Sequence, residues 1–200
     1  MTPRTYVQDR RATSAAATKR RILDAAAELY RAHGVAATSI QAIAERADVA
    51  RGTVINHFGS AEGILEALLD EAVAEIRFPD ARILEGAATD EARIRQFVDG
   101  MFQFFVRSQD WWAVFVADRE LPAVRAREQA YWDEVGRLHA ATFGNLAADP
   151  VVGAAVRAFV DYGPLYALLG AGLSLDDSIE VVGDALVAIV DRRRGKGGSG

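Results

Sequence analysis

Five polar side chains between residues 41 and 57 have the types and spacing needed for hydrogen bonding to a large polar partner. They are Gln41, Arg51, Thr53, Asn56 and His57. Arginine, glutamine and asparagine can make paired hydrogen bonds to a planar group, and threonine and histidine can donate to an anion. The last four recur at intervals that keep them off the apolar side of one short helix. Their chemistry is recognition through hydrogen bonds, which requires elements that hold them at a fixed spacing.

A short amphipathic helix is expected to carry Gln41. Thr38 and Gln41 can form a capping box that starts this helix at Ser39. We expect the helix to stop at Asp48, because aspartate tolerates left-handed backbone geometry better than most residues do. The apolar residues that share one face of it are Ile40, Ile43, Ala44 and Ala47.

A second short helix is predicted over residues 51–58. Val54 and Phe58 lie four residues apart, so both would face inward. Ser60 can then cap a third helix. This order is the one by which proteins place a helix in the major groove of DNA. The residues expected to contact DNA are Ser39, Gln41, Arg51, Gly52, Thr53, Asn56 and His57. The alternative is a helix pair with a polar outer face that never touches DNA.

Charge is unevenly distributed along the chain. Through Ser60 there are nine Lys and Arg against five Asp and Glu, whereas the whole chain has a net charge of −5. A basic N-terminal part on an acidic protein suits a polyanionic partner bound at one end. Residues 1–17 are expected to form a flexible basic arm, and the alternative is a solvated terminus without a partner. The basic residues expected to contact phosphates are Arg10, Arg11, Lys19 and Arg20.

The segment from Thr18 to Leu69 resembles the DNA-binding domain of the TetR family of transcriptional regulators. The residues that carry the resemblance are Ile22, Leu23, Ala25, Ala26, Leu29, Gly34, Thr38, Ser39, Ile40, Ile43, Ala44, Val49, Gly52, Thr53, His57, Phe58, Ser60, Glu62, Ile64 and Leu65. The resemblance implies base contacts for Gln41, Arg51 and Thr53, and phosphate contacts for His57 and Ser39. It also favours a homodimer. We expect a repressor that binds a near-palindromic operator and is released by a small effector, which the aromatic residues described below predict to be mainly apolar.

Four positions depart from the family's usual pattern. Ile55 replaces a common Tyr and Ala61 a common Lys, and both usual residues contact phosphate. Asp48 stands at a usual Gly, and Ala50 replaces a Ser that would cap the second helix. The departures favour one alternative function, a ligand-binding helical dimer with weak or lost DNA binding.

The remaining sequence predicts an all-α protein of about nine helices. Further helices are expected over residues 60–77, 91–106, 111–117, 122–146, 151–172 and 175–194, with Ser174 and Asp177 forming a capping box for the last. We predict a DNA-binding domain over 18–64, a ligand-binding and dimerisation domain over 65–194, and a flexible tail over 195–200. Two helices from each subunit, 151–172 and 175–194, would pair in a four-helix bundle. The alternative for these helices is an ordinary monomer core.

Aromatic residues are concentrated in the middle helices. Most would form core, but helix-bounded apolar cavities with a few polar groups are where small ligands bind. The candidate pocket residues are Phe102, Phe105, Trp111, Trp112, Phe115, Tyr131, Trp132, Phe143, Tyr162 and Tyr166. Asp118 and Asp161 are among the carboxylates that could orient a ligand there.

The composition excludes several classes of site. The chain has no cysteine, which rules out disulfides and cysteine-ligated zinc. His33, His57 and His139 stand singly, and no nucleophile elbow or phosphate loop is present, so we expect no enzyme, metal or cofactor. Neither a signal peptide nor a long apolar run is apparent, so we expect a cytoplasmic protein without a membrane span.

Overall fold

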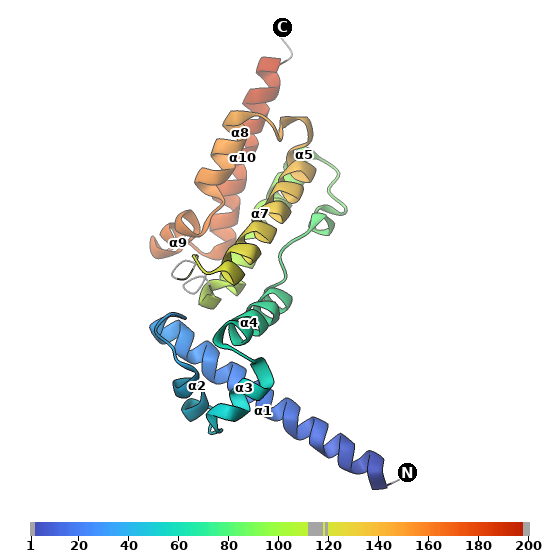
Figure 1. Ribbon diagram of the computed structural model, residues 1–200. Helices are drawn as coiled ribbons and strands as arrows, with labels where there is room; N and C mark the ends of the chain where they lie inside the picture. The colour runs from blue at the N-terminus through green and yellow to red at the C-terminus, as the bar shows by residue number, and fades with distance from the viewer. Residues whose placement is uncertain (1–2, 112–117, 119, 198–200) are drawn as a thin grey trace. The chain divides into compact units, whose positions relative to one another are not determined.

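The computed structural model describes residues 3–111, 118 and 120–197 (Figure 1). Helices and turns make up these residues without any strand, which confirms the all-α fold. They fall into two compact units. The first combines Met1–Glu75 with Asp110–Glu128, and the second combines Ile76–Gln109 with Gln129–Gly200. The domain limits expected from the sequence stay a prediction.

The first unit is built on a long helix and three shorter ones. They are α1 (Pro3–His33), α2 (Ile40–Arg46), α3 (Arg51–Phe58) and α4 (Ala61–Ile76). Their apolar faces meet in one core, whose buried members include Ile22, Leu23, Tyr30, Ile43, Val54, Ile64, Leu65 and Leu69. Burial of these side chains against one another is what holds the short helices α2 and α3, since helices of this length are not stable alone.

The start of α1 differs from the expected flexible arm. The structure continues α1 to Pro3, so residues 3–17 are helical and extend past α2 and α3 (Figure 1). The sequence there contains a run of alanines near Thr13, and alanine is the strongest helix former.

The cap of α2 differs from the predicted box between Thr38 and Gln41. The Ser39 Oγ accepts a hydrogen bond from Ala42 N at 3.1 Å, and α2 begins at Ile40. Thr38 is unavailable as the cap because its Oγ1 donates to the Gly34 carbonyl oxygen at 2.8 Å. The predicted stop is confirmed, since Asp48 has a φ of 52°.

The second unit contains the remaining helices. These are the 3-10 turn η1 (Ala81–Leu84), α5 (Asp90–Arg107), most of α7 (Pro122–Phe143), the 3-10 turn η2 (Gly144–Leu146), α8 (Pro150–Phe159), α9 (Tyr162–Gly170) and α10 (Leu175–Gly197). α10 packs chiefly on α5 and also on α8 and α9. The predicted box at the start of α10 is confirmed, because Asp177 N donates to Ser174 Oγ at 3.0 Å and Ser174 N donates to Asp177 Oδ2 at 3.3 Å.

The single helix predicted over residues 151–172 was wrong. The helical backbone ends at Val160, whose φ and ψ are −107° and 73°, and α9 begins after Asp161. The Asp161 side chain caps α9 by accepting from Tyr162 N at 2.7 Å. Pro164 explains the break, because a helical proline has no N–H to donate and its ring would clash with the Val160 carbonyl.

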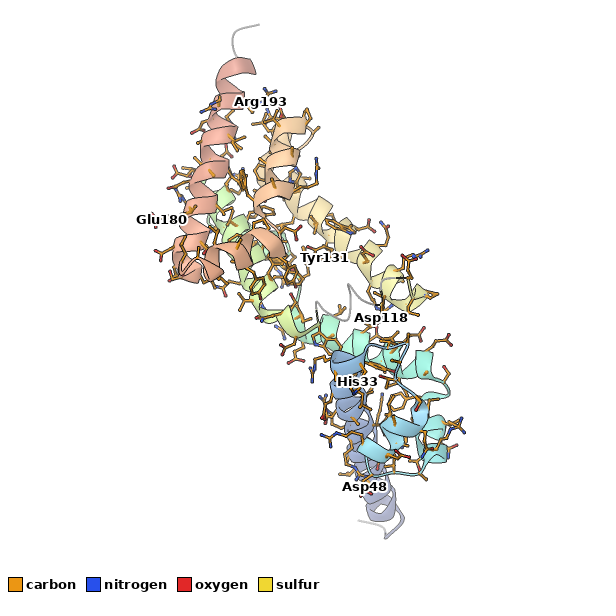
Figure 2. All side chains as sticks on the ribbon, turned by 90° about the vertical axis from the view of Figure 1, so that its left-hand side faces the viewer. His33, Asp48, Asp118, Tyr131, Glu180 and Arg193 are labelled. Carbon is orange, nitrogen blue, oxygen red and sulfur yellow. The ribbon has the colours of Figure 1, made fainter. Side chains whose placement is uncertain are left out.

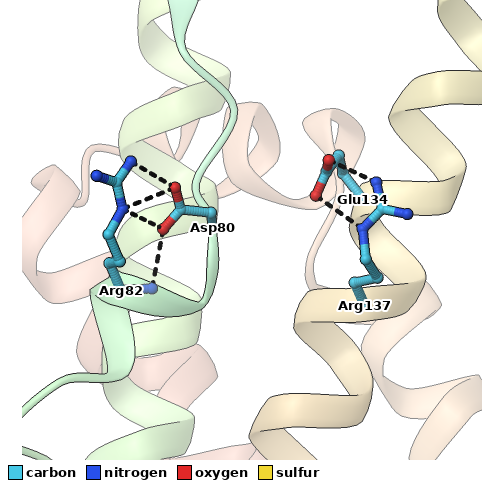
Figure 3. A network of polar contacts seen from close by, with 4 residues as sticks. All are labelled: Asp80, Arg82, Glu134 and Arg137. Carbon is cyan, nitrogen blue, oxygen red and sulfur yellow. Dashed lines mark hydrogen bonds and ion pairs between the residues drawn. The ribbon is translucent and has the colours of Figure 1, made fainter.

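Two local ion pairs lie on the surface of the second unit (Figure 3). Arg82 Nη2 lies 2.6 Å from Asp80 Oδ2, and Arg137 pairs with Glu134 one helical turn away. Exposed pairs of this kind contribute little to stability. The predicted helix over 111–117 lies, apart from Trp111, outside the described residues. Within the described part, no helix is long and apolar enough to cross a membrane.

Candidate nucleic-acid interface

The helices α2 and α3 present their polar side chains outward. Ile43, Ala44 and Val54 are buried in the core, which orients the opposite faces of the two helices toward solvent. Among the predicted DNA contacts, Ser39, Gln41, Arg51, Gly52 and Asn56 are exposed, and Thr53 and His57 are half-buried. The structure therefore brings all seven residues to one helix pair, and burial of their apolar neighbours is the reason.

The first turn of α3 is open. A Cβ added to Gly52 would meet no atom within 4 Å, so the fold does not require glycine at this position. Ala50 precedes α3 without a side-chain hydrogen bond, as expected from the missing serine. An open glycine beside an exposed Arg51 is an arrangement that allows another molecule to approach the backbone closely.

Side chains around the helix pair are tied to each other. Gln41 Nε2 donates to Glu45 Oε1 at 2.7 Å on the same helix. Arg46 Nη2 donates to both carboxylate oxygens of Glu28 at 2.7 and 2.6 Å, which joins α2 to α1. The Gln41 amide must leave Glu45 or share its donors before it can make a paired contact with a base.

Two of the four predicted phosphate contacts on α1 have partners within the unit. Arg20 pairs with Asp24 at 2.7 Å and with Glu71 of α4 at 3.0 Å, and Lys19 Nζ lies 5.8 Å from the centre of the Phe58 ring. The hydrogen bond with Asp24, together with the negative charges of Asp24 and Glu71, raises the pKa of Arg20. The side chains of Arg10 and Arg11 lie outside the described ones.

One carboxylate contacts the turn that leads from α1 to α2, and the sequence did not predict this contact. Asp118, one of the carboxylates that could orient a ligand, accepts a hydrogen bond from Val35 N at 3.0 Å through its Oδ2. It is only 9% exposed and lies beside the end of α1 where His33 is found (Figure 2). The sequence holds no signal for this contact, because 83 positions separate the two residues.

The aromatic residues do not all gather in one place. Trp111 packs against the core of the first unit, and Trp112 and Phe115 lie outside the described residues. In the second unit, Phe78 also joins the aromatic residues, although it was not among the predicted pocket residues. Its ring packs edge-on against Phe104 and Tyr131, with ring centres 5.0 and 5.3 Å apart. The predicted pocket residues of this unit are Phe102, Phe105, Phe143 and Tyr162, which are buried, Tyr131 and Tyr166, which are half-buried, and Trp132, which is 52% exposed.

Two tyrosines of this cluster are shielded from solvent. Burial raises the pKa of Tyr162 to about 12, although a hydrogen bond with the Ser108 hydroxyl acts the other way. Burial also raises the pKa of Tyr131, with a further contribution from the charge of Asp161. Phe105 lies 4.5 Å from Tyr162 between ring centres. The described residues hold no group of three or more His, Asp or Glu side chains able to bind a metal.

Comparison with known proteins identifies the first unit. Residues 22–68 match the model of the bacterial regulatory proteins of the tetR family. This segment of the first unit is what the chain shares with that family. The matched segment runs from α1 into α4, so it contains the whole α2–α3 pair and all seven residues predicted to contact DNA.

Two curated relatives each match part of the chain. The A-factor receptor protein of Streptomyces griseus is 34% identical over 87 residues, which cover 44% of this chain and 28% of the relative. The HTH-type transcriptional regulator YvkB of Bacillus subtilis is 43% identical over 54 residues, 27% of this chain and 29% of the relative. The chain thus spans less than a third of either relative. The SmeT–triclosan complex has the same fold, with a TM-score of 0.59 and 19% identity over 86% of this chain and 91% of that one.

Proposed function

We propose that this protein is a ligand-responsive transcriptional repressor that binds a near-palindromic operator as a homodimer. The observation that carries the proposal is the outward face of α2 and α3, where seven residues suited to DNA contact lie together on the part that matches the family. Arg51 and Thr53 at the start of α3 would contact base edges, and Gln41 would reach the same groove from α2. Ser39 and His57 would contact phosphates.

The dimer interface is proposed on α8 and α10. Large apolar side chains remain uncovered there, since Val151 is 45%, Phe159 38% and Val181 50% exposed. Pairing these helices with their copies would remove that surface from water. A two-fold axis would then allow two copies of α3 to read successive major grooves about 34–36 Å apart.

The effector is proposed to be small, mainly apolar and aromatic. The second unit offers the exposed Trp132 beside Tyr131, whose ring centres are 5.0 Å apart, next to the cluster of buried phenylalanines. SmeT, a protein of the same fold, is known bound to triclosan, a chlorinated phenol. An effector would release the operator only through a higher affinity for the conformation that does not bind DNA.

The test is selection of bound duplexes from a random DNA pool by the full-length protein at low salt, followed by gel shifts with the enriched sequence. We expect an enriched near-palindrome, and at least tenfold weaker binding by Arg51→Ala. Adding triclosan as the first probe, then other apolar phenols, should release the DNA. No enrichment would reject the repressor.

A second candidate function is a ligand-binding dimer with weak DNA binding. It is favoured by Ile55 and Ala61, which stand where the family usually has residues that bind phosphate. That function predicts no enrichment from the DNA pool but quenching of Trp132 fluorescence by the same phenols. A variant that keeps Trp132 as its single tryptophan tests where the phenol binds. If the phenol releases the operator from this variant without quenching its tryptophan fluorescence, the ligand site does not lie beside Tyr131 and Trp132.

A further inference from the structure

The DNA-binding unit is built from two separate stretches of the chain, the N-terminal helices α1 to α4 and a segment much later in the sequence. Residues 110–128 belong to the first unit by their contacts, although the family match ends at residue 68. Val124, at 1% exposure, is part of the core shared by α1 to α4, and Leu121 and Ala123 pack against that core. The same α7 continues beyond residue 128 into the second unit. The core that holds the recognition helix is therefore completed by residues of this later segment.

Within this segment, Asp118 makes a specific contact with the turn after α1. Its Oδ2 accepts from Val35 N at 3.0 Å, and a Cβ on Gly34 would lie 3.8 Å from the same oxygen. Gly34 ends α1 with a φ of 81°, which frees the Val35 N–H from the helix. A carboxylate is disfavoured beside a helix C-terminus, so the hydrogen bond and not the helix dipole must hold Asp118 there.

The Val35 bond reaches α2 through the short turn that follows. Thr38 N donates to the Val35 carbonyl oxygen at 3.1 Å, and the next residue, Ser39, is the cap of α2. The Val35 backbone is thus hydrogen-bonded to Thr38, the residue just before the cap of α2. Releasing Val35 N would free the turn and with it the start of α2.

A second buried donor lies near the same carboxylate. Tyr30 is 2% exposed, and its hydroxyl has no hydrogen-bond partner among the described residues. Burial raises the pKa of Tyr30 to about 12, and the charge of Asp118 contributes to that rise. Replacing Tyr30 is therefore a suitable control. It alters the same buried region but leaves the hydrogen bond between Asp118 and Val35 N in place.

We propose that Asp118 is a positioning residue for operator binding, whose carboxylate fixes the turn between α1 and α2 and thereby the placement of α3. The inference rests on the proposed DNA-binding function. It makes Asp118 a structural part of the DNA-binding unit, so a change that moved Asp118 would reach the turn before α2 through its hydrogen bond with Val35, in addition to the packing of Val124 in the core.

The test compares full-length Asp118→Ala, Asp118→Asn and Tyr30→Phe with the wild type on the selected operator across a salt series. A hydrogen bond to a charged group is strong enough that its removal changes an equilibrium about tenfold. We expect Asp118→Ala to bind about tenfold more weakly, with a shallower salt dependence because a misplaced α3 neutralises fewer phosphates. Asparagine retains an acceptor, so Asp118→Asn should bind like the wild type, as should Tyr30→Phe.

A purely structural role would give a different pattern. Destabilisation would lower the fraction of active protein in Asp118→Ala while leaving the salt dependence of that fraction unchanged, and Tyr30→Phe would behave similarly. Either result overturns the proposal, as does an Asp118→Asn variant as weak as Asp118→Ala.

Amide exchange separates this inference from the proposed function. Measured without DNA, exchange at Val35 should be faster in Asp118→Ala than in the wild type, and unchanged in Asp118→Asn. If the wild type selects no DNA, the repressor function fails, and a role in operator binding fails with it. If DNA binds but exchange at Val35 is equal in all variants, only the positioning role is wrong.

Discussion

Asp149 joins the beginning of α8 to the end of α10 through Arg193. Its Oδ1 caps α8 by accepting from Val151 N at 2.8 Å and Val152 N at 3.2 Å, and its Oδ2 accepts from the Arg193 guanidinium at 2.9 and 2.8 Å. The bond with Arg193, followed by the backbone bonds, lowers the pKa of Asp149. One carboxylate thus aligns the two helices proposed to form the dimer interface.

Replacing Asp149 by alanine should lower the melting temperature by about 2–4 °C, because α8 loses its cap. The pKa of Asp149 is lower in the folded chain, so its contribution to stability is present above the ordinary value of 3.8 and is lost as the pH falls below that value. Thermal unfolding at pH 7 and pH 3 checks both points. Asp191 is an exposed carboxylate on α10, so Asp191→Ala should change neither the melting temperature nor its dependence on pH. If both variants lowered the melting temperature to a similar extent, Asp149 would not act as a cap.

High pH should destabilise the fold through Tyr30. Its pKa is raised from 10.0 to about 12 in the folded chain, so the phenol ionises more easily after unfolding. Stability is therefore retained below pH 10 and falls between about pH 10 and 12. Denaturant unfolding at pH 9 and pH 11 should show a smaller fall for Tyr30→Phe than for the wild type. An equal fall would exclude Tyr30 as a contributor.

Gly52→Ala should separate folding from DNA binding. The added methyl group meets no atom within 4 Å, and alanine is favoured over glycine in a helix, so the melting temperature should stay the same or rise slightly. Operator affinity should fall by at least threefold, because the methyl group would occupy space next to the DNA. Gel shifts and thermal unfolding check this variant, and undiminished affinity would place Gly52 outside the interface. Gly63→Ala is the matched contrast: its Cβ would lie 2.1 Å from the Phe58 carbonyl oxygen, so that variant should lose stability itself.

Val181→Glu should convert the proposed dimer to a monomer. Val181 is 50% exposed on α10, and burying a charge between two copies of this helix is costly. Val73→Glu is the control, because Val73 is equally exposed, at 51%, on α4 of the other unit. Sedimentation at micromolar concentration should show a monomer only for Val181→Glu. If both variants remained dimeric, the dimer interface would not include the face of α10 that carries Val181.

Removing residues 2–17 should weaken operator binding and reduce its dependence on salt. The deletion removes Arg4, Arg10 and Arg11, whereas Lys19 and Arg20, which already have partners, remain. For each phosphate that the shortened chain no longer neutralises, the slope of log affinity against log salt becomes shallower by about 0.9. Binding measured over a salt series checks this expectation. An identical slope in the shortened chain would show that the start of α1 makes no phosphate contact.

Local signals explain which expectations the structure confirmed. Asp48 takes the left-handed backbone because its short polar side chain tolerates it, and Ser174 pairs with Asp177 because a capping box needs only neighbours. The cap of α2 moved to Ser39 because the Thr38 hydroxyl has a competing partner in the Gly34 carbonyl. The break between α8 and α9 has a local cause in Pro164. The proline is visible in the sequence, but the helical spacing of the apolar residues on both sides of it predicted one continuous helix.

The sequence by itself determined the helical class, the helix-turn-helix and its outward residues, because periodicity and capping act over a few positions. Only the tertiary structure decided that Val124 completes the core of the first unit, that Asp118 holds Val35, and that Trp111 packs on the same core. The physical reason is that burial and hydrogen bonding depend on which surfaces meet after folding. Asp118 meets Val35 in a fold that also buries Val124, six residues later, in the core of α1 to α4.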